Sequence, residues 1–208
     1  MKSNYLKYKI VYQSKENVWG KYNHLLKFKK QKWTKIVKKV DRVRKFHFYR
    51  RPRSSRALSR QRLLAKQTFQ HFYGNVPYTT LKKEYRQIQK TLSLDPVQTL
   101  MISLERRLDV FLFRSGLFTS ILEAKQAILH QKIWVNNRIV SQGNYRLKSG
   151  DFIRLPQTNQ PSSTVQLPYS QINVSLSLLV FLRNPTIQEI RYPFPLNVDF
   201  LTNYLNTK

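Results

Sequence analysis

Positively charged side chains recur through residues 119 to 140, a stretch that reads TSILEAKQAILHQKIWVNNRIV. It contains Lys125, His130, Lys132 and Arg138. Arg binds phosphate groups as a two-pronged donor and Lys binds them as a point charge. The chemistry that these residues favour is therefore the binding of an anion. The alternative is that they are solvated charges on an ordinary surface.

Patterns for catalysis or metal binding are scarce in the sequence. The four histidines have none of the spacings that bind zinc, there is no cysteine, and no glycine-rich phosphate loop occurs. One triplet, Arg107-Leu108-Asp109, has a catalytic counterpart, because an Arg-Leu-Asp triplet surrounds the catalytic aspartate of a large pseudouridine synthase family. Here Asp109 lies in a predicted helix beside arginines that can pair with it, and the chain has no room for the catalytic domain of those enzymes. We predict no enzyme, no metal and no cofactor.

The net charge of the chain indicates a polyanionic partner. The 208 residues carry 38 Lys and Arg against 10 Asp and Glu, a formal charge of +28, and such a chain repels itself unless an anion neutralises it. The longest apolar run, residues 178 to 182, is far shorter than the ~20 residues that span a bilayer. Charge alone would also fit a membrane surface, but we predict nucleic acid and no membrane.

The cations are concentrated toward the N-terminus. Residues 1 to 66 contain 22 Lys and Arg against two acidic residues, whereas residues 67 to 208 contain 16 against eight. Aromatic side chains lie among the cations of residues 27 to 56, and this mixture can stack on nucleic acid while neutralising it. We predict a basic N-terminal extension over residues 1 to 55. The alternative is a solvated linker.

Helical periodicity predicts the elements that precede the cationic stretch. A first helix runs from Ser59 and ends at Gly74 and Pro77, with an apolar face of Ala65, Phe69, Phe72 and Tyr73. A second helix, capped by Thr80, has an apolar stripe of Leu81, Tyr85, Ile88 and Leu92. A third, capped by Asp95 with Pro96 at its first position, has an apolar row of Leu100, Leu104, Leu108 and Phe111 and places Arg107 and Arg114 on one face.

The cationic stretch itself predicts a short helix and a hairpin. Ser120 with Glu123 forms a capping pair for a helix in which Ala124 and Ile128 face the core while Lys125 points elsewhere. Residues 133 to 140 then form a hairpin around Asn136-Asn137, since Asn tolerates the positive φ of a two-residue turn.

Shorter elements are predicted after the hairpin. Residues 145 to 155 contain two short strands around a Ser-Gly-Asp turn, and residues 156 to 168 have the composition of a linker. A half-buried strand follows, with Ile172, Val174, Leu176 and Leu178 on its apolar side. A last helix, capped by Asn197, has Val198, Leu201 and Leu205 on one side.

Residues 104 to 153 resemble the RNA-binding module of the small-subunit ribosomal protein four family. Order and spacing match the family pattern at Arg107, Leu108, Asp109, Arg114, Gly116, Glu123, Ala124, Lys125, Gln126, His130, Ile133, Val135, Asn136, Tyr145, Lys148, Gly150, Asp151 and Ile153. Ile121 and Lys125 stand where the family usually has arginines, Leu129 where it has serine, and Asn137 where it has glycine.

The flanks of the module also resemble this family. The module alone occurs in pseudouridine synthases, a tyrosyl-transfer-RNA synthetase and small stress proteins. Here residues 63 to 76 resemble the family's helix before a Phe-Tyr-Gly sequence, residues 25 to 33 resemble the basic arm of mitochondrially encoded members, and residues 190 to 206 resemble its C-terminal return. The family resemblance therefore extends over most of the chain.

Comparison with branches of the family favours a mitochondrial protein. Bacterial members often open with a cysteine zinc site, and plastid members keep a bacterial-like N-terminal region; both are missing from this sequence. Codons rich in A and T would produce its many Lys, Asn, Ile, Phe and Tyr residues. The N-terminus has neither a signal peptide nor an import presequence. We expect the mitochondrial matrix as location, in the small ribosomal subunit, with synthesis from an organelle gene.

The resemblance implies an α+β fold with a helical N-terminal domain, a compact helix-helix-hairpin module and a C-terminal segment that packs back on the helical domain. The expected divisions are a basic extension (residues 1 to 55), a helical domain (56 to 98, completed by 186 to 208), the RNA-binding module (99 to 156), and a linker and strand (157 to 185).

The resemblance also implies a structural constituent of the small ribosomal subunit that binds small-subunit ribosomal RNA at a multi-helix junction and helps early assembly. Ribosomal proteins three and five are the expected neighbours, and messenger RNA passes nearby as it enters. The expected RNA-binding residues are Arg50, Arg51, Arg53, Arg56, Arg60, Arg62, Arg106, Arg107, Arg114, Ser120, Lys125, Gln126, His130, Lys132, Asn136, Arg138, Arg146 and Lys148. The alternatives are an RNA-modifying enzyme of the pseudouridine synthase type and a free RNA chaperone.

Overall fold

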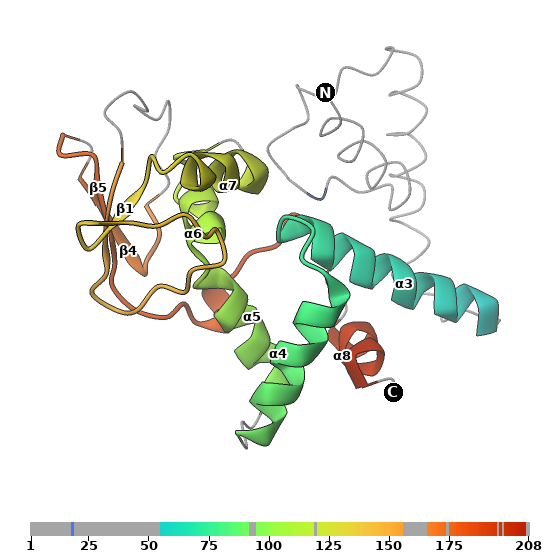
Figure 1. Ribbon diagram of the computed structural model, residues 1–208. Coiled ribbons are helices and arrows are strands. Elements are labelled where there is room, and N and C mark those ends of the chain that lie inside the picture. The colour runs from blue at the N-terminus through green and yellow to red at the C-terminus, as the bar shows by residue number, and fades with distance from the viewer. Residues whose placement is uncertain are drawn as a thin grey trace, which may run out of the picture. The chain divides into compact units, whose positions relative to one another are not determined.

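The computed structural model describes residues 55 to 91, 95 to 118, 120 to 155, 166 to 173, 175 to 194 and 198 to 206, with the single residues Val18 and Leu196 (Figure 1). Described residues up to Tyr78 and from Tyr192 form one compact unit, and residues 79 to 191 form a second. Apart from Val18, the predicted N-terminal extension lies outside the described residues, and so do Arg50, Arg51, Arg53, Leu92, Val174, Asn197 and most of the predicted linker.

Helix α3 (Ser55–Phe72) is the main helix of the first unit. It begins four residues before the predicted start and ends where predicted, because Gly74 and Asn75 adopt positive φ of 74° and 61°. The Asn75 N–H then bonds the Gln70 carbonyl at 2.8 Å, which satisfies an open carbonyl at the helix end. The predicted apolar face is confirmed at Phe69, Phe72 and Tyr73, which are buried.

An aromatic cluster joins α3 to the C-terminal part of this unit. The rings of Phe72 and Tyr192 meet edge to face with centroids 5.3 Å apart, and the Tyr73 and Tyr192 hydroxyls lie within 2.7 Å of each other. Helix α8 (Val198–Asn206) contacts α3 and buries Leu201. The predicted apolar side of α8 is wrong at Val198, which is 39% exposed in the first turn.

Helix α4 (Tyr78–Lys90) buries Leu81 and Tyr85, as the apolar stripe predicted. The predicted cap at Thr80 is wrong, because the helix has already begun at Tyr78.

Two helices occupy the segment that the sequence predicted as one. Helix α5 (Pro96–Glu105) starts with the predicted cap, since Asp95 Oδ1 accepts the N–H groups of Val97 and Gln98 at 3.1 and 3.2 Å. Helix α6 (Leu108–Arg114) starts separately, because Arg107 is extended at φ −68° and ψ 136°.

The break between α5 and α6 is filled by a loop from later in the chain. The Leu108 and Asp109 N–H groups bond the carbonyls of Tyr145 and Gly143 at 2.9 and 3.2 Å, and the Leu147 N–H bonds the Arg106 carbonyl at 2.9 Å. These tertiary bonds satisfy first-turn donors that would otherwise lack partners, so the helix can restart there.

Helix α7 (Ile121–Leu129) has the predicted serine cap, with Ser120 Oγ accepting the Glu123 N–H at 3.1 Å. Ala124 and Ile128 are fully buried, as predicted. Ile121 is also fully buried, so in this chain the position that usually holds a family arginine belongs to the core.

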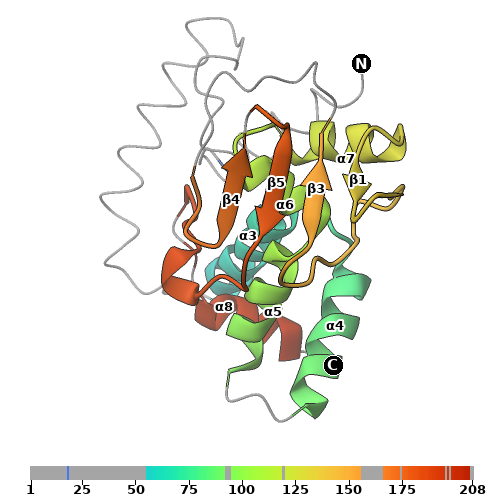
Figure 2. The same cartoon turned by 90° about the vertical axis from the view of Figure 1, so that its left-hand side faces the viewer.

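A five-stranded antiparallel sheet lies against these helices in the second unit (Figure 2). Its order is β2-β1-β3-β5-β4, formed by β1 (Trp134–Val135), β2 (Arg138–Ile139), β3 (Phe152–Arg154), β4 (Ser170–Asn173) and β5 (Leu178–Phe181). The predicted hairpin turn is confirmed, because Asn136 and Asn137 have φ of 49° and 64°. Residues of helices and strands pack together in one core, as Leu108, Ile128, Ile153 and Phe181 illustrate.

Two strand predictions are wrong. The first strand expected in residues 145 to 155 is only an isolated bridge between Arg146 and Arg107. The single strand expected across residues 172 to 178 is a hairpin instead, with a turn between β4 and β5 in which Leu176 is 66% exposed. Asn173 Oδ1 accepts the Leu176 N–H at 3.2 Å and so closes a turn that apolar alternation had concealed.

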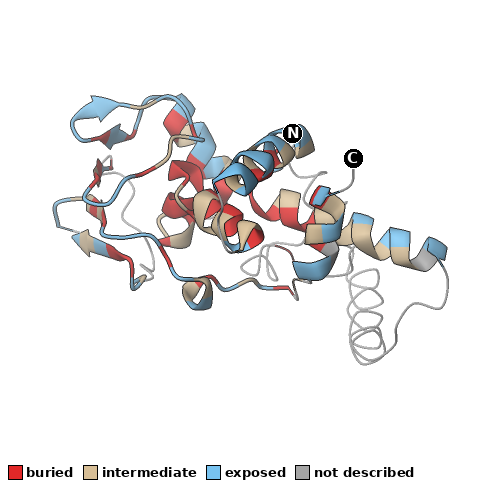
Figure 3. Ribbon diagram, turned by 90° about the horizontal axis from the view of Figure 1, so that it is seen from below, coloured by how far each residue is buried: buried red, intermediate tan, exposed pale blue. Residues whose placement is uncertain are grey.

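The helices that pack against other elements have a buried side, which is red beside tan or pale blue in Figure 3. The short 3-10 helix η1 (Ile187–Glu189) contacts α5 and completes the second unit. Among the described residues, no helix is both long enough and apolar enough to span a membrane.

Candidate nucleic-acid interface

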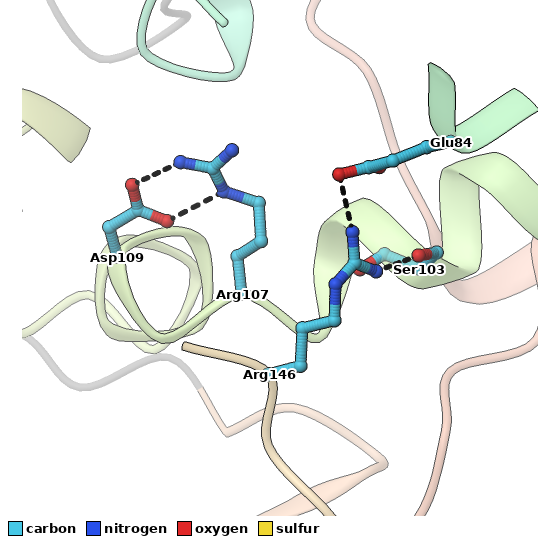
Figure 4. A network of polar contacts seen from close by, with 5 residues as sticks. All are labelled: Glu84, Ser103, Arg107, Asp109 and Arg146. Atoms are coloured by element: carbon cyan, nitrogen blue, oxygen red, sulfur yellow. Dashed lines mark hydrogen bonds and ion pairs between the residues drawn. The ribbon is translucent and has the colours of Figure 1, made fainter. Parts of the chain in front are cut away.

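Arg107 forms a buried ion pair instead of facing a ligand (Figure 4). Its Nε and Nη2 donate to Asp109 Oδ1 and Oδ2 at 3.1 and 2.7 Å, and the two side chains are 9% and 1% exposed. Asp109 Oδ1 also accepts the Val110 N–H at 2.9 Å. The Arg-Leu-Asp triplet is therefore occupied by structural contacts.

Arg114 is held in the same manner. Its guanidinium makes a two-pronged contact with Glu105 at 3.0 and 2.7 Å, and it donates to the Arg191 carbonyl at 2.6 Å. The Glu105 side chain is fully buried and that of Arg114 is 14% exposed. Arg107 and Arg114, which helical spacing places on one face, are each turned onto a carboxylate, and their contact with RNA stays a prediction.

Two further arginines connect residues 146 to 148 to the helices through an ion pair and hydrogen bonds. Arg146 pairs with Glu84 of α4 at 2.7 Å and donates to both the carbonyl and the hydroxyl of Ser103, as Figure 4 shows. Arg106 Nε donates to the Leu147 carbonyl at 3.0 Å. These side chains are partly buried, so they hold this strand-like segment more than they offer charge to solvent.

Ser120 is likewise a structural residue, because it is 4% exposed and its oxygen caps α7. Asn136 stands at the hairpin turn with its amide engaged. Its Nδ2 donates to Asp151 Oδ1 at 2.8 Å, and its Oδ1 accepts the Phe152 N–H at 3.1 Å. Asp151 Oδ2 in turn accepts the Lys148 N–H at 2.8 Å, so this aspartate ties the Lys148 turn to the hairpin turn.

The remaining predicted residues of the module are exposed. They come from α7, the residues directly after it, the hairpin and the turn before β3, and we name them the α7–hairpin surface: Lys125, Gln126, His130, Lys132, Arg138 and Lys148. Among the described residues, none of its Lys and Arg side chains forms an ion pair.

Lys125 is positioned by a close approach of the loop that caps α6. A β-carbon added at Gly143 would lie 3.2 Å from Lys125 Cγ and 3.3 Å from Asp109 Oδ2. The aliphatic stem of Lys125 therefore runs beside buried structure while the residue remains exposed. A larger residue at position 143 would push this stem away.

In the first unit, Arg56 and Arg60 are exposed on α3 and Arg62 is half-buried. The Nε of Arg62 is buried with no hydrogen-bond partner within the described structure.

A second row of exposed cations, which was not predicted from the sequence, lies on α4. Lys83, Arg86 and Lys90 are exposed there, while Leu81 and Tyr85 of the same helix are buried. Their spacing of three and four residues was a readable signal, since it places them on one side of a helix. A solvated helix face would have the same pattern.

Several titrating groups of the described residues respond to their surroundings. A hydrogen bond from Arg183 holds the pKa of Glu189 at about 2, below its ordinary 4.5, and a backbone hydrogen bond at Thr186 adds to this. Burial lowers the pKa of His71 and raises that of Tyr169. No group of three or more His, Cys, Asp or Glu able to hold a metal ion occurs in the described part of the chain.

Comparisons with known proteins match both the module and the chain around it. Residues 106 to 153 match the S4 domain family. Small ribosomal subunit protein uS4m of Reclinomonas americana is 29% identical over 160 residues, covering 68% of this chain and 63% of that protein. Small ribosomal subunit protein uS4 of Cereibacter sphaeroides (strain ATCC 17025 / ATH 2.4.3) is 26% identical over 208 residues, with 95% of each chain covered.

Small ribosomal subunit protein uS4 of Rhodospirillum rubrum is 26% identical over 152 residues, covering 68% of this chain and 74% of that protein. The matched S4 domain contains the α5–α6 break, α7 and strands β1 to β3. The S4 domain thus lies in the second unit, and over most of its length the chain is similar to small ribosomal subunit proteins uS4 and uS4m.

Proposed function

We propose that this protein is a structural constituent of the small ribosomal subunit that binds small-subunit ribosomal RNA through its S4 domain. The observation that carries the proposal is the α7–hairpin surface, whose cations have no carboxylate partner among the described residues, whereas Arg107, Arg114 and Arg146 nearby are paired with carboxylates. A chain with a formal charge of +28 and its relatives' names support the same conclusion.

Phosphates are the groups that this surface suits. Side chains cannot read the deep, narrow major groove of A-form RNA, so recognition relies on shape, 2′-hydroxyls and phosphates. Lysines on a helix and on a neighbouring turn can neutralise phosphates on two sides of an RNA junction. We infer that shape selects the RNA and that Lys125, Lys132, Arg138 and Lys148 supply the charge.

The finer parts of the proposal rest on the family and on the sequence. We propose binding at a multi-helix junction, a role in early assembly, a place in the mitochondrial matrix, and ribosomal proteins three and five as neighbours beside the path by which messenger RNA enters. Arg50 to Arg62 would extend the RNA contact from the N-terminal extension. The predicted division of the chain at residues 55, 98, 156 and 185 is part of the same proposal.

Asp109 favours the structural interpretation over the enzymatic one. A catalytic aspartate must reach its substrate, but this carboxylate is 1% exposed and is bound by Arg107 and by the Val110 N–H.

The salt dependence of RNA binding tests the proposal. Each phosphate contact should contribute roughly −0.7 to −0.9 to the slope of log K against log salt, measured with the full chain and a small-subunit RNA junction fragment. Lys125→Gln with Lys132→Gln should make the slope shallower by roughly 1.4 to 1.8. The matched control, Lys83→Gln with Lys90→Gln, removes the same charge from α4 and should change the slope by less.

An equal loss from both pairs of substitutions would show that only total charge matters, and it would contradict a role for the α7–hairpin surface. Sedimentation of the protein away from small subunits in a sucrose gradient of organelle extract would favour the free chaperone instead.

A further inference from the structure

Apolar side chains gather on the outer side of the sheet in the second unit over β2, β1, β3 and β5, while Gln171 and Asn173 of the edge strand β4 make the same side polar beyond them. Register places Trp134 beside Ile139 on one side and Arg154 on the other, and Arg154 beside Leu178. Directly paired residues point to the same face of a sheet. These four residues therefore form a continuous row across β2, β1, β3 and β5.

A second row on this face is half-buried. Phe152 pairs with Val180, two residues along from Arg154 and Leu178, so both rows share the face. We name Ile139, Trp134, Arg154, Leu178, Phe152 and Val180 the outer sheet face. Ile153 and Leu179 alternate with them and lie in the core with α6 and α7, so the outer sheet face is on the opposite side of the sheet.

Large apolar side chains on the outer sheet face meet solvent. Trp134 is 42% exposed and Ile139 is 49% exposed, and they are direct neighbours across the strands. Single exposed apolar residues are normal on a protein surface, but a contiguous row is typical of an interaction site. Beyond Arg154 the row ends at the half-buried Leu178 in β5.

Arg154 determines which charge a partner bound to the outer sheet face must carry. It is exposed in the middle of the row, and within the described structure it has no ion pair, in contrast to the paired arginines of the same domain. A partner that covers the row must supply an anion there, because an unpaired buried charge is strongly unfavourable. The face therefore requires apolar groups beside a negative charge.

We propose that the outer sheet face docks a neighbouring protein through a segment of apolar side chains next to an Asp or Glu that pairs with Arg154. This goes beyond RNA binding. Single-stranded RNA is bound by stacking of bases on aromatic side chains, and the exposed row contains one aromatic residue among aliphatic ones. Aromatic and Arg residues beside aliphatic ones, with few other charges, are typical of protein–protein contacts.

Two other occupants are disfavoured by their charge. Residues 156 to 165 follow the strand that contains Arg154, but their sequence PQTNQPSSTV has no acidic residue. A second copy of the chain would bring another +28. Addition of a strand at the β2 edge would offer very few backbone bonds, because β2 has two residues.

Photo-cross-linking tests the proposal with the full chain. A photoreactive phenylalanine derivative replaces Ile139, and small subunits are reconstituted from their ribosomal RNA and total protein. We expect a cross-linked product that protease destroys and nuclease leaves intact, with the cross-linked partner peptide containing Asp or Glu beside apolar residues. The matched control carries the same derivative at Leu129, which is 59% exposed on α7 and should give no such product.

The charge requirement is tested separately. Arg154→Glu should reduce the yield of the protein cross-link by about tenfold or more, because like charges then meet at the interface. Affinity of the full chain for small-subunit RNA should remain unchanged in Trp134→Ser with Ile139→Ser, and this separates failure of docking from failure of RNA binding.

Several outcomes would overturn the proposal. One is a cross-link to RNA, to residues 156 to 165 of the same chain or to a second copy of the chain. Another is a cross-linking yield at position 139 that is no higher than the yield at position 129. A third is a cross-linking yield that Arg154→Glu does not change. Loss of RNA affinity in the Trp134 and Ile139 variant would assign the face to RNA instead.

Discussion

Two groups of cations in the second unit have the same charge but different surroundings. Three arginines on or beside α5 and α6 each form an ion pair with a carboxylate at 2.7 Å: Arg107, Arg114 and Arg146. Lys125 and Lys148 of the α7–hairpin surface are exposed, and no ion pair forms at them among the described residues. A basic residue in an RNA-binding domain is thus no guide to RNA contact by itself.

The difference lies in the partners that the fold supplies. Glu105 and Asp109 are buried and would be costly without a cation, so the nearest guanidiniums turn inward. The planar fork of Arg matches a carboxylate with two parallel bonds, whereas a Lys ammonium is readily hydrated at a surface. Among the described residues of the second unit, paired charge falls mainly to arginine, and charge that stays open to solvent falls mainly to lysine.

Removing a buried arginine should give the largest loss of stability, and it tests whether the paired arginines are structural. Arg107→Ala leaves Asp109 charged and buried, and we expect the free energy of unfolding to fall by about 3 to 5 kcal/mol. Urea unfolding followed by circular dichroism measures it. As a control, Arg107→Met with Asp109→Leu removes both charges and should recover part of the loss. Unchanged stability with lost RNA affinity would reverse the role assigned to Arg107.

Arg114→Ala should have the next largest effect. Glu105 would lose a two-pronged contact while fully buried, but solvent reaches the Arg114 site more readily, so we expect a loss of about 2 to 4 kcal/mol in the same unfolding experiment. Adding Glu105→Gln should restore part of it by removing the buried charge. No recovery in the double variant would indicate that Arg114 acts through the Arg191 carbonyl alone.

Asn136→Ala probes the hairpin that supports the exposed group. It removes the bonds to Asp151 and to the Phe152 N–H at a position of positive φ, and we expect unfolding to become easier by about 1 to 3 kcal/mol. Asn137→Gly is the matched change at the adjacent turn residue, where glycine accepts positive φ, and it should be neutral or slightly stabilising. Equal losses in both variants would argue that the turn conformation, not the Asn136 amide, matters.

Lys148→Gln tests an exposed lysine against the paired arginines. Its stability should stay within about 0.5 kcal/mol of the parent chain, as for ordinary surface substitutions. Its RNA affinity should respond less to salt, with the slope shallower by roughly 0.7 to 0.9. Binding against salt and urea unfolding together give the answer. A stability loss as large as that of Arg107→Ala would place Lys148 with the structural cations.

The Arg183–Glu189 pair should show the smallest effect, because its arginine is nearly half exposed and water screens the pair. The folded-state pKa of Glu189, about 2, lies below the ordinary 4.5. Its contribution to stability is therefore complete above the ordinary value and is lost as the pH falls toward the folded value. As the pH is lowered, the Tm of the parent chain should fall slightly more steeply than the Tm of Glu189→Gln. Identical acid profiles would contradict the lowered pKa.

Local signals in the sequence were sufficient for several elements. Asp95 and Ser120 cap their helices as predicted, Gly74 ends α3, and Asn136-Asn137 forms the hairpin turn, because each depends on a residue and its immediate neighbours. The alternation across residues 172 to 178 misled, since a turn held by the Asn173 side chain interrupts it. The break at Arg107 was invisible because its supporting bonds come from residues 143 to 147.

The candidate site divides in the same way. Sequence and composition determined the excess of positive charge, the S4 pattern and the outward position of Lys125, which follows from helical periodicity beside Ala124 and Ile128. Which cations remain open was decided only by tertiary structure. Arg146 meets Glu84 62 positions earlier in the chain, and Arg106 meets the Leu147 carbonyl 41 positions later. Contacts of this kind depend on distance in space, which spacing along the chain does not reveal.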